Sequence, residues 1–258
     1  MMLAVVLSVL LADLTADAPA HPTRSEGWEV SIGAGVAAAP SYQGSSALRV
    51  LPLPFIDVRY ADRFFISPLG GVGVNVIALP ALHLGVALAP DLGRTEGSDA
   101  RLSGWAHIDP VAVGRLFAEI RLGPLLAVSG IRHELGASSG TLVDVGLSSM
   151  FPLGRNLILT GGATLTWADG RYMREYFGIG QLQLADARKD HVTTALFAPG
   201  AGLRDLALSL GAIVPFDECW SVNTFFRGTI LLGDVASSPV VQQATQLAMG
   251  TMLVYRWR

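Results

Sequence analysis

Residues 28–36 read WEVSIGAGV, and their side chains alternate in polarity with a period of two. The apolar Trp28, Val30 and Ile32 stand at even positions, and Glu29 stands between the first two. Successive side chains of a β-strand point to opposite faces, whereas the apolar positions of a helix recur every three to four residues. The segment therefore predicts a β-strand with one apolar face.

The same alternation recurs along the chain, most clearly at 116–122, 205–214 and 247–257. The second face of these segments carries Gly, Ala, Ser and Thr with occasional charges, and Lys189 is the single lysine of the chain. The outer face of a soluble sheet would instead be rich in Lys and Glu. Small residues opposite large apolar ones fit a narrow barrel whose interior is crowded and whose exterior meets lipid.

The composition is that of a membrane protein. Of the 258 residues, 51% are hydrophobic and 15% are charged, and the mean hydropathy is +0.46. Beyond the N-terminus there is no run of 18 or more apolar residues, the minimum for a spanning helix. High hydropathy without such a run is typical of a transmembrane β-barrel, and the competing class is a soluble all-β protein with a large core.

We expect an all-β fold, an antiparallel transmembrane β-barrel of twelve strands, with ten strands as the main alternative. The number depends on residues 64–79, which could hold one long strand or two. An even number returns both termini to the periplasm, and splitting this region gives twelve. The expected strands are 28–39, 48–60, 62–69, 71–79, 82–90, 112–122, 125–135, 141–151, 157–168, 201–214, 219–232 and 246–257.

The connections between these strands differ in length. Short turns at 123–124, 152–156 and 217–218 are expected on the periplasmic side. The longer connections, expected to face outward, are 41–47, 92–111, 171–200 and 233–245.

The first 20 residues have the features of a secretory signal. Residues 3–11 form an apolar segment too short to span a membrane, and Ala18-Pro19-Ala20 fits a small-x-small cleavage site, although no basic residue precedes them. We therefore expect a cleaved signal peptide at 1–20, a barrel domain at 21–258 and a location in the outer membrane of a Gram-negative cell.

Pro52 and Pro54 alternate with leucines inside the second expected strand. Proline has no backbone N–H and is normally excluded from central strands. A closed barrel has no free edge, so the two prolines predict a bulge or a local break in pairing. They share parity with Val50 and Ile56 and should face lipid.

Signatures of catalysis and of metal binding are weak. The sequence IRHEL at 131–135 begins like a zinc-protease motif, but Ala137 stands where the second histidine is needed. Ser129 and His133 share a face but would lie about 13 Å apart at the rise of a strand, too far for a nucleophile and its base. The lone Cys219 can form neither an internal disulfide nor a metal cluster. We therefore expect no enzyme, metal or cofactor.

The net charge of −3 and the absence of a basic stripe also disfavour nucleic acid as a partner. Outer-membrane lipid is the partner that the apolar strands predict.

Charged residues on the inward face form a candidate lumen cluster. Either the charges pair and stiffen the barrel, or they line a pore and select its solutes. We favour pairing, because twelve strands filled with such side chains leave little open lumen. The candidate residues are Asp57, Arg59, Arg115, Glu119, Arg121, Asp144 and Arg227.

Arg204 and Asp205 are adjacent in one expected strand, so they should point to opposite faces and not pair with each other. Asp205 should lie inside near the outer rim and meet a charge from a neighbouring strand or loop.

Five stretches in a fixed order resemble the MipA/OmpV family of Gram-negative outer-membrane proteins. They are PSYQG (40–44) with RVLPLP (49–54), EYFGI (175–179), AGLRD (201–205), GDVASSP (233–239) and the closing YRW (255–257). The residues that carry the resemblance are Pro40, Ser41, Tyr42, Gly44, Arg49, Pro52, Pro54, Tyr176, Phe177, Gly178, Arg204, Asp205, Gly233, Asp234, Ser238 and Pro239, with Tyr255 and Trp257 as the insertion signal.

The resemblance implies an outer-membrane barrel without catalytic residues. It also implies a scaffold that associates with a lytic murein transglycosylase and a penicillin-binding protein. A narrow porin-like channel or small-molecule binder is the alternative, followed by a lipid-modifying enzyme. Each motif could also serve only to order a loop.

Overall fold

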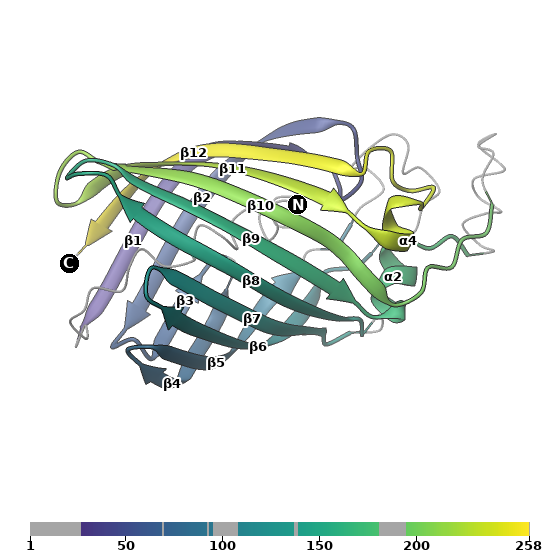
Figure 1. Ribbon diagram of the computed structural model, residues 1–258, viewed down its shortest axis with the longest axis horizontal. Helices are drawn as coiled ribbons and strands as arrows, with labels where there is room; N and C mark the ends of the chain where they lie inside the picture. Colours follow the sequence, from purple (N-terminus) through teal and green to yellow (C-terminus); the bar gives the residue numbers. More distant parts are fainter. Residues whose placement is uncertain are drawn as a thin grey trace.

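The computed structural model describes residues 27–68, 70–91, 93–94, 108–136, 139–180 and 195–257. These residues form a closed barrel of antiparallel strands with two short helices at one end (Figure 1). The strands are β1 (Trp28–Pro40), β2 (Leu48–Tyr60), β3 (Phe64–Ser67), β4 (Gly71–Leu79), β5 (Leu82–Asp91), β6 (Val111–Leu122), β7 (Leu125–Glu134), β8 (Thr141–Pro152), β9 (Ile158–Ala168), β10 (Gly202–Pro215), β11 (Trp220–Leu231) and β12 (Thr245–Trp257). The helices are α2 (Gly170–Phe177) and α4 (Gly233–Ala236).

Each strand pairs with its neighbours in sequence, and β1 pairs with β12 to close the barrel. The expectation of twelve strands is confirmed and the alternative of ten is wrong. All strand ends lie within one residue of the expected ones except those of β3, which is four residues long instead of eight. The chain turns sharply before β3, because Ala61 and Asp62 both have positive φ, and the side-chain amide of Asn75 donates to the carbonyl of Asp62 at 2.7 Å.

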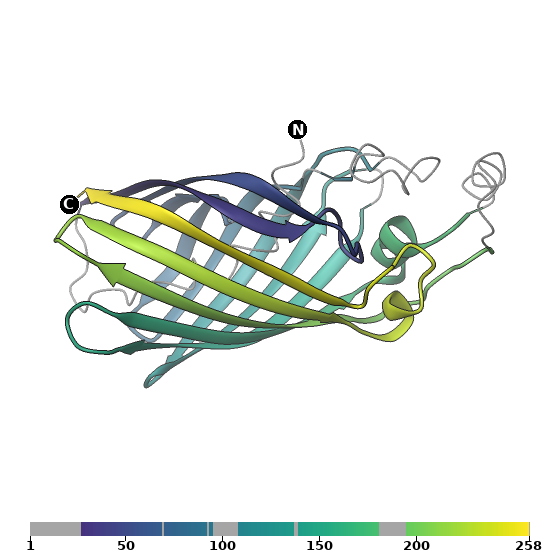
Figure 2. The ribbon, with the colours of Figure 1, turned by 90° about the horizontal axis from the view of Figure 1, so that it is seen from above.

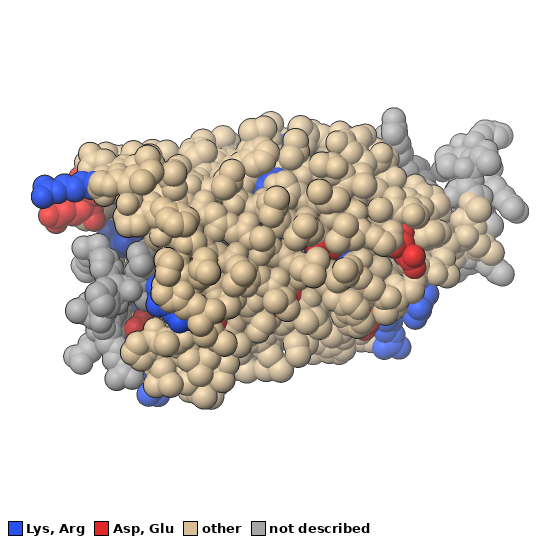
Figure 3. Space-filling view, viewed as in Figure 1, with Lys and Arg blue, Asp and Glu red and all other residues tan. Residues whose placement is uncertain are grey.

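The large apolar side chains face outward. On β2, for example, Val50 is 75% exposed and Ile56 is 56% exposed, whereas Leu53 between them is 1% exposed. In the space-filling view the barrel surface is almost free of charged side chains between its two ends, where they gather (Figure 3). This band of apolar surface is what a barrel presents to lipid. None of the described helices is long and apolar enough to cross a membrane.

The two ends of the barrel differ. β1 begins and β12 ends at the end that carries the short turns, and in bacterial outer-membrane barrels this is the periplasmic end. Aromatic side chains mark it: Trp28 lies 4.8 Å from Tyr60 between ring centroids, and Trp220 lies 4.9 Å from Tyr255. Trp257 is 66% exposed. α2 and α4 lie together at the opposite end, far from the C-terminus (Figure 2), which we call the outer end.

The interior is not uniformly polar. Behind β1, β2, β11 and β12 the inward side chains form one apolar cluster, against which Leu51 and Phe55 also pack. Its buried members are Ala37, Ala39, Leu53, Phe225, Ala248, Met252 and Val254. Porin lumens are lined by polar residues, so this wall is unusual for a water-filled channel.

The bulge expected at the two prolines is absent. The register of β1 and β2 runs without a shift from Trp28 opposite Tyr60 to Pro40 opposite Leu48. Pro52 and Pro54 do face outward and are exposed. The pairing is interrupted on the other edge of β2, where only residues 58–60 pair with β3.

The signal peptide expected at 1–20 and the single lysine, Lys189, lie outside the described residues.

Candidate functional site

The family-like stretches, apart from the closing YRW, meet at the outer end of the barrel. The corner at 41–47 connects β1 to β2, EYFGI ends α2, Arg204 and Asp205 begin β10, and GDVASSP forms α4 and the residues after it. Hydrogen bonds join these segments although they are up to about 200 residues apart in sequence. We call the assembly of α2, α4 and the 41–47 corner the outer plug.

The 41–47 corner is bonded to the connection between β11 and β12. The hydroxyl of Tyr42 donates to the carbonyl of Val240 at 3.1 Å and accepts from the side-chain amide of Gln242 at 2.9 Å. The N–H of Gly44 donates to Gln246 Oε1 at 3.0 Å. Gly44 has φ of 101°, in the left-handed region, and a Cβ there would lie 2.8 Å from the side chain of Val241. Only glycine fits this close approach.

α2 is an amphipathic helix that the sequence analysis did not predict. Asp169 caps it, since its Oδ1 accepts from the N–H of Tyr172 at 2.7 Å. Tyr172, Met173, Tyr176 and Phe177 are all buried and recur at the three-to-four-residue spacing of one helix face. The ring centroids of the two tyrosines lie 4.1 Å apart in a stacked pair.

The buried face of α2 is held by hydrogen bonds from three sides. The hydroxyl of Tyr176 donates to Glu134 Oε1 at 2.9 Å, and the carbonyl of Tyr176 accepts from Arg94 Nη1 at 2.9 Å. The hydroxyl of Ser238 donates to the carbonyl of Phe177 at 2.6 Å. The family-like stretches at 175–179 and 233–239 are therefore in direct contact.

Burial also fixes the protonation of the tyrosines. It raises the pKa of Tyr172 to about 12 and raises that of Tyr176 further, because desolvation disfavours the phenolate. Both hydroxyls therefore keep their protons at physiological pH. Glu134 and Arg94, which are both buried, are not among the residues that the sequence predicts for this site.

Arg204 and Asp205 both point inward, so the expectation that they face opposite sides is wrong. The register of β9 and β10 shifts between Leu203 and Asp205, which marks a β-bulge. The extra residue lets two consecutive side chains lie on one face. Arg204 Nε and Asp205 form a buried ion pair, and Arg204 Nη1 donates to the hydroxyl of Tyr172 at 3.1 Å. Asp205 does lie inside near the outer rim and does meet a charge, as expected.

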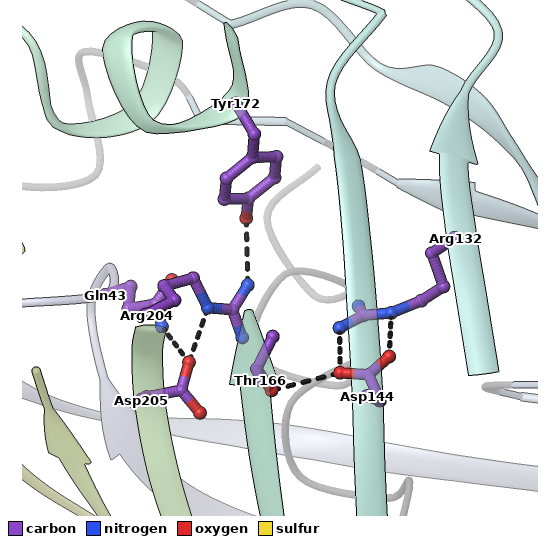
Figure 4. A network of polar contacts seen from close by, with 7 residues as sticks. All are labelled: Gln43, Arg132, Asp144, Thr166, Tyr172, Arg204 and Asp205. Atoms are coloured by element: carbon purple, nitrogen blue, oxygen red, sulfur yellow. Dashed lines mark hydrogen bonds and ion pairs between the residues drawn. The ribbon is translucent and has the colours of Figure 1, made fainter. Parts of the chain in front are cut away.

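A second ion pair lies on the inner wall beside the first (Figure 4). Arg132 on β7 donates twice to Asp144 on β8, at 2.6 Å through Nε and 2.7 Å through Nη2. The hydroxyl of Thr166 on β9 donates to the same carboxylate at 3.0 Å. Arg115 on β6 stands directly opposite Arg132 in the strand register. Asp144 therefore lies beside Arg132 and close to the charges of Arg115 and Arg204. Of these three arginines, only Arg132 is not among the residues named from the sequence.

The remaining members of the expected lumen cluster have further contacts of their own, and the charge of Glu119 also acts on Arg115. Asp57 Oδ1 pairs with Arg59 Nε on its own strand at 3.0 Å. Glu119 Oε2 lies 3.8 Å from His83 Nδ1. Arg121 is exposed at the periplasmic end of β6. Arg227 is buried on β11, four residues below the outer end of that strand. These ion pairs are thus local, Asp57 with Arg59 and Arg132 with Asp144.

The residues considered for catalysis are not arranged for it. Ser129 and His133 lie on the exposed face of β7, and His133 Nδ1 lies 2.9 Å from the hydroxyl of Thr141. Cys219 lies half-buried at the periplasmic end. In the described part of the chain, no group of three or more His, Cys, Asp and Glu side chains could hold a metal ion.

One family model matches most of the chain. The model of the family described as "MltA-interacting protein MipA" matches residues 32–257. A search of the curated proteins finds no match.

Several solved outer-membrane barrels are similar in structure at low sequence identity. The COG4313 outer-membrane channel of Pseudomonas putida F1 is 8% identical with a TM-score of 0.44, covering 93% of this chain and 99% of that one. The translocator domain of the autotransporter NalP from Neisseria meningitidis is 13% identical with a TM-score of 0.43, covering 93% and 91%. OmpT of Vibrio cholerae is 8% identical with a TM-score of 0.38, covering 89% and 96%.

Proposed function

Since the family model covers nearly all of its length, this chain belongs to the MltA-interacting protein MipA family, and we propose that it is an outer-membrane scaffold that binds murein enzymes at its periplasmic end. Its partners in this proposal are a lytic murein transglycosylase and a penicillin-binding protein. The closed barrel and the family place it in the outer membrane. It performs no catalysis in this role.

The observation that carries the proposal is the packed outer plug. α2 buries four large side chains across the outer end, and the ion pairs of Arg132 and Arg204 lie directly beneath it. A helix packed across the outer end favours a role in binding over a role in conducting solutes. The periplasmic end then remains as the surface on which a partner in the periplasm can dock.

Two adjacent turns offer apolar anchors at that end. Leu153 in the turn between β8 and β9 is 54% exposed, and Phe216 in the turn between β10 and β11 is 58% exposed. The charged Arg155, Asp217 and Glu218 flank them and are exposed. Exposed apolar side chains with a polar rim are typical of protein interfaces. A specific interface usually buries more than about 1,000 Å², so several of the turns must contribute together.

The Leu153→Asp/Phe216→Asp variant should lose its partner. We expect affinity-tagged protein from its own cells to recover the transglycosylase and the penicillin-binding protein, and the variant to recover at least about tenfold less. Two apolar anchors each contribute more than about 1 kcal/mol when an interface depends on them, and 1.4 kcal/mol corresponds to tenfold. Quantitative mass spectrometry of the recovered proteins measures this.

The matched control is Leu135→Asp/Leu196→Asp, which places the same charges on exposed leucines of the outer end. It should recover the enzymes as the wild type does. Recovery by the wild type no higher than by an unrelated outer-membrane barrel would remove the scaffold proposal.

A further inference from the structure

The outer part of β2 has a backbone partner on one side only. All thirteen of its residues pair with β1, but only residues 58–60 pair with β3. Among the described residues, the backbone of residues 48–57 pairs with no strand on the β3 side. The reason is the length of β3, which ends at Ser67 and returns as β4 at Gly71. The barrel wall is therefore notched between the outer part of β2 and the β3–β4 hairpin.

The hydrogen-bond pattern shows which groups of β2 face the notch. Just beyond the β1–β2 ladder, the N–H of Ser41 donates to the carbonyl of Ala47 at 2.9 Å. Residues of an antiparallel pair alternate between bonding each other and pointing away. The odd residues of β2 therefore bond β1, and the even residues point their N–H and C=O groups toward the notch. The two prolines stand at even positions.

The position of Pro52 and Pro54 on this edge of β2 accounts for their presence within a strand. An unpaired N–H in hydrocarbon costs several kcal/mol, and proline has none to leave unpaired. Their rings remove two of the four donors that residues 50–56 would otherwise present to the notch. Proline on an exposed edge is also a known way of preventing another strand from pairing there. At these two positions the edge therefore cannot donate to a strand from another protein.

The surroundings of the notch suit an acyl chain. On the lipid-facing surface of the barrel wall, Val50 and Ile56 are exposed. On the inner side, Leu51, Leu53 and Phe55 belong to the apolar wall of the barrel. Lipid on the barrel surface and apolar side chains inside the barrel thus lie on the two faces of a strand that is paired along one edge only.

We propose that this notch is a lateral opening through which an acyl chain of an outer-leaflet lipid reaches the apolar cluster inside the barrel. This inference is independent of the scaffold role. It identifies a binding site by chemistry, since an edge from which proline removes half of the donors, lying between two apolar surfaces, favours a hydrocarbon chain over a further strand.

Photo-crosslinking in living cells tests the opening. Leu51, which points inward beside the notch, is replaced by p-benzoylphenylalanine. Irradiation should then yield a lipid adduct on the folded protein, identified by intact mass. The mass distinguishes lipid A from a phospholipid.

Two control positions give the highest and the lowest expected yield of lipid adduct. The same photoreactive residue at Val50 faces lipid and must give an adduct. At Ser209 it points inward from β10, which pairs on both sides, and should give none. Heat-modifiable migration verifies folding. If the variant with the photoreactive residue at position 51 does not fold, that residue is placed at position 55 instead, where it replaces Phe55. An adduct at position 50 with none at 51 or 55 would overturn the proposal, as would equal yields at 51 and 209.

Discussion

Asp144→Ala should lower the free energy of unfolding by about 3 kcal/mol. The carboxylate accepts two hydrogen bonds from Arg132 and one from Thr166, and Arg115 stands opposite Arg132 across β6 and β7. Removing it leaves two arginines facing each other, and like charges directly opposite in a sheet are destabilising. We place the loss at the lower end for buried pairs, because the side chains of Arg132 and Asp144 remain 26% and 21% exposed. Denaturant unfolding in detergent micelles, followed by tryptophan fluorescence, measures it.

The pair variant Arg132→Met/Asp144→Leu is the control. Replacing both partners of a buried ion pair by apolar residues of similar volume is often nearly neutral. We therefore expect it to unfold within about 1 kcal/mol of the wild type. If Asp144→Ala lowers the free energy of unfolding by an equally small amount, the ion pair of Arg132 and Asp144 is solvated and does not stiffen the barrel.

Tyr172→Ala/Tyr176→Ala should open the outer end. Each tyrosine is buried, and truncating a buried aromatic side chain costs about 3–5 kcal/mol. The double change also removes the hydrogen bonds to Glu134 and Arg204. An eight-residue helix cannot remain docked after such a loss, since short helices depend on tertiary packing. In planar bilayers the wild type should give no steady conductance, and the variant should give discrete steps.

Arg171→Ala/Glu175→Ala is the matched control, because both side chains lie on the exposed face of the same helix. It should behave as the wild type. Steady conductance of the wild-type protein would contradict the view that the plug closes the barrel and would favour a narrow channel.

The strands could be predicted from sequence because alternation is a local property. Each strand carries its own period-two pattern, and turn residues such as Gly123 and Pro124 mark its ends. The same parity correctly places Asp57, Arg115 and Asp144 on the inward face.

The contacts between strands could not be predicted in this way. The partner of Asp144 is Arg132, which depends on the register of β7 and β8. The bulge at Arg204 reverses parity for one residue and creates an ion pair that adjacency alone excludes. The prolines at 52 and 54 indicate a break in pairing, but the sequence of β2 does not show that the break lies on the β3 side, because it depends on the short length of β3.

α2 could have been recognised. Asp169 is a good helix cap, and Tyr172, Met173, Tyr176 and Phe177 follow at helical spacing. The pattern covers only eight residues within the long connection between β9 and β10. The contacts of α2 with Glu134, Arg204 and Ser238 depend on the tertiary fold, and they give the helix its place in the outer plug.

The scaffold role depends most on which end of the barrel faces the cell exterior. The plug lies at one end, with exposed Ala236 on α4, and the proposed docking turns lie at the other, with exposed Glu218. A membrane-impermeant maleimide on intact cells tests this directly, with Ala236→Cys and Glu218→Cys each made in a Cys219→Ser background. Position 236 should react in intact cells and position 218 only after the outer membrane is permeabilised. Labelling of position 218 in intact cells, with position 236 protected, would contradict the orientation and the scaffold role that rests on it.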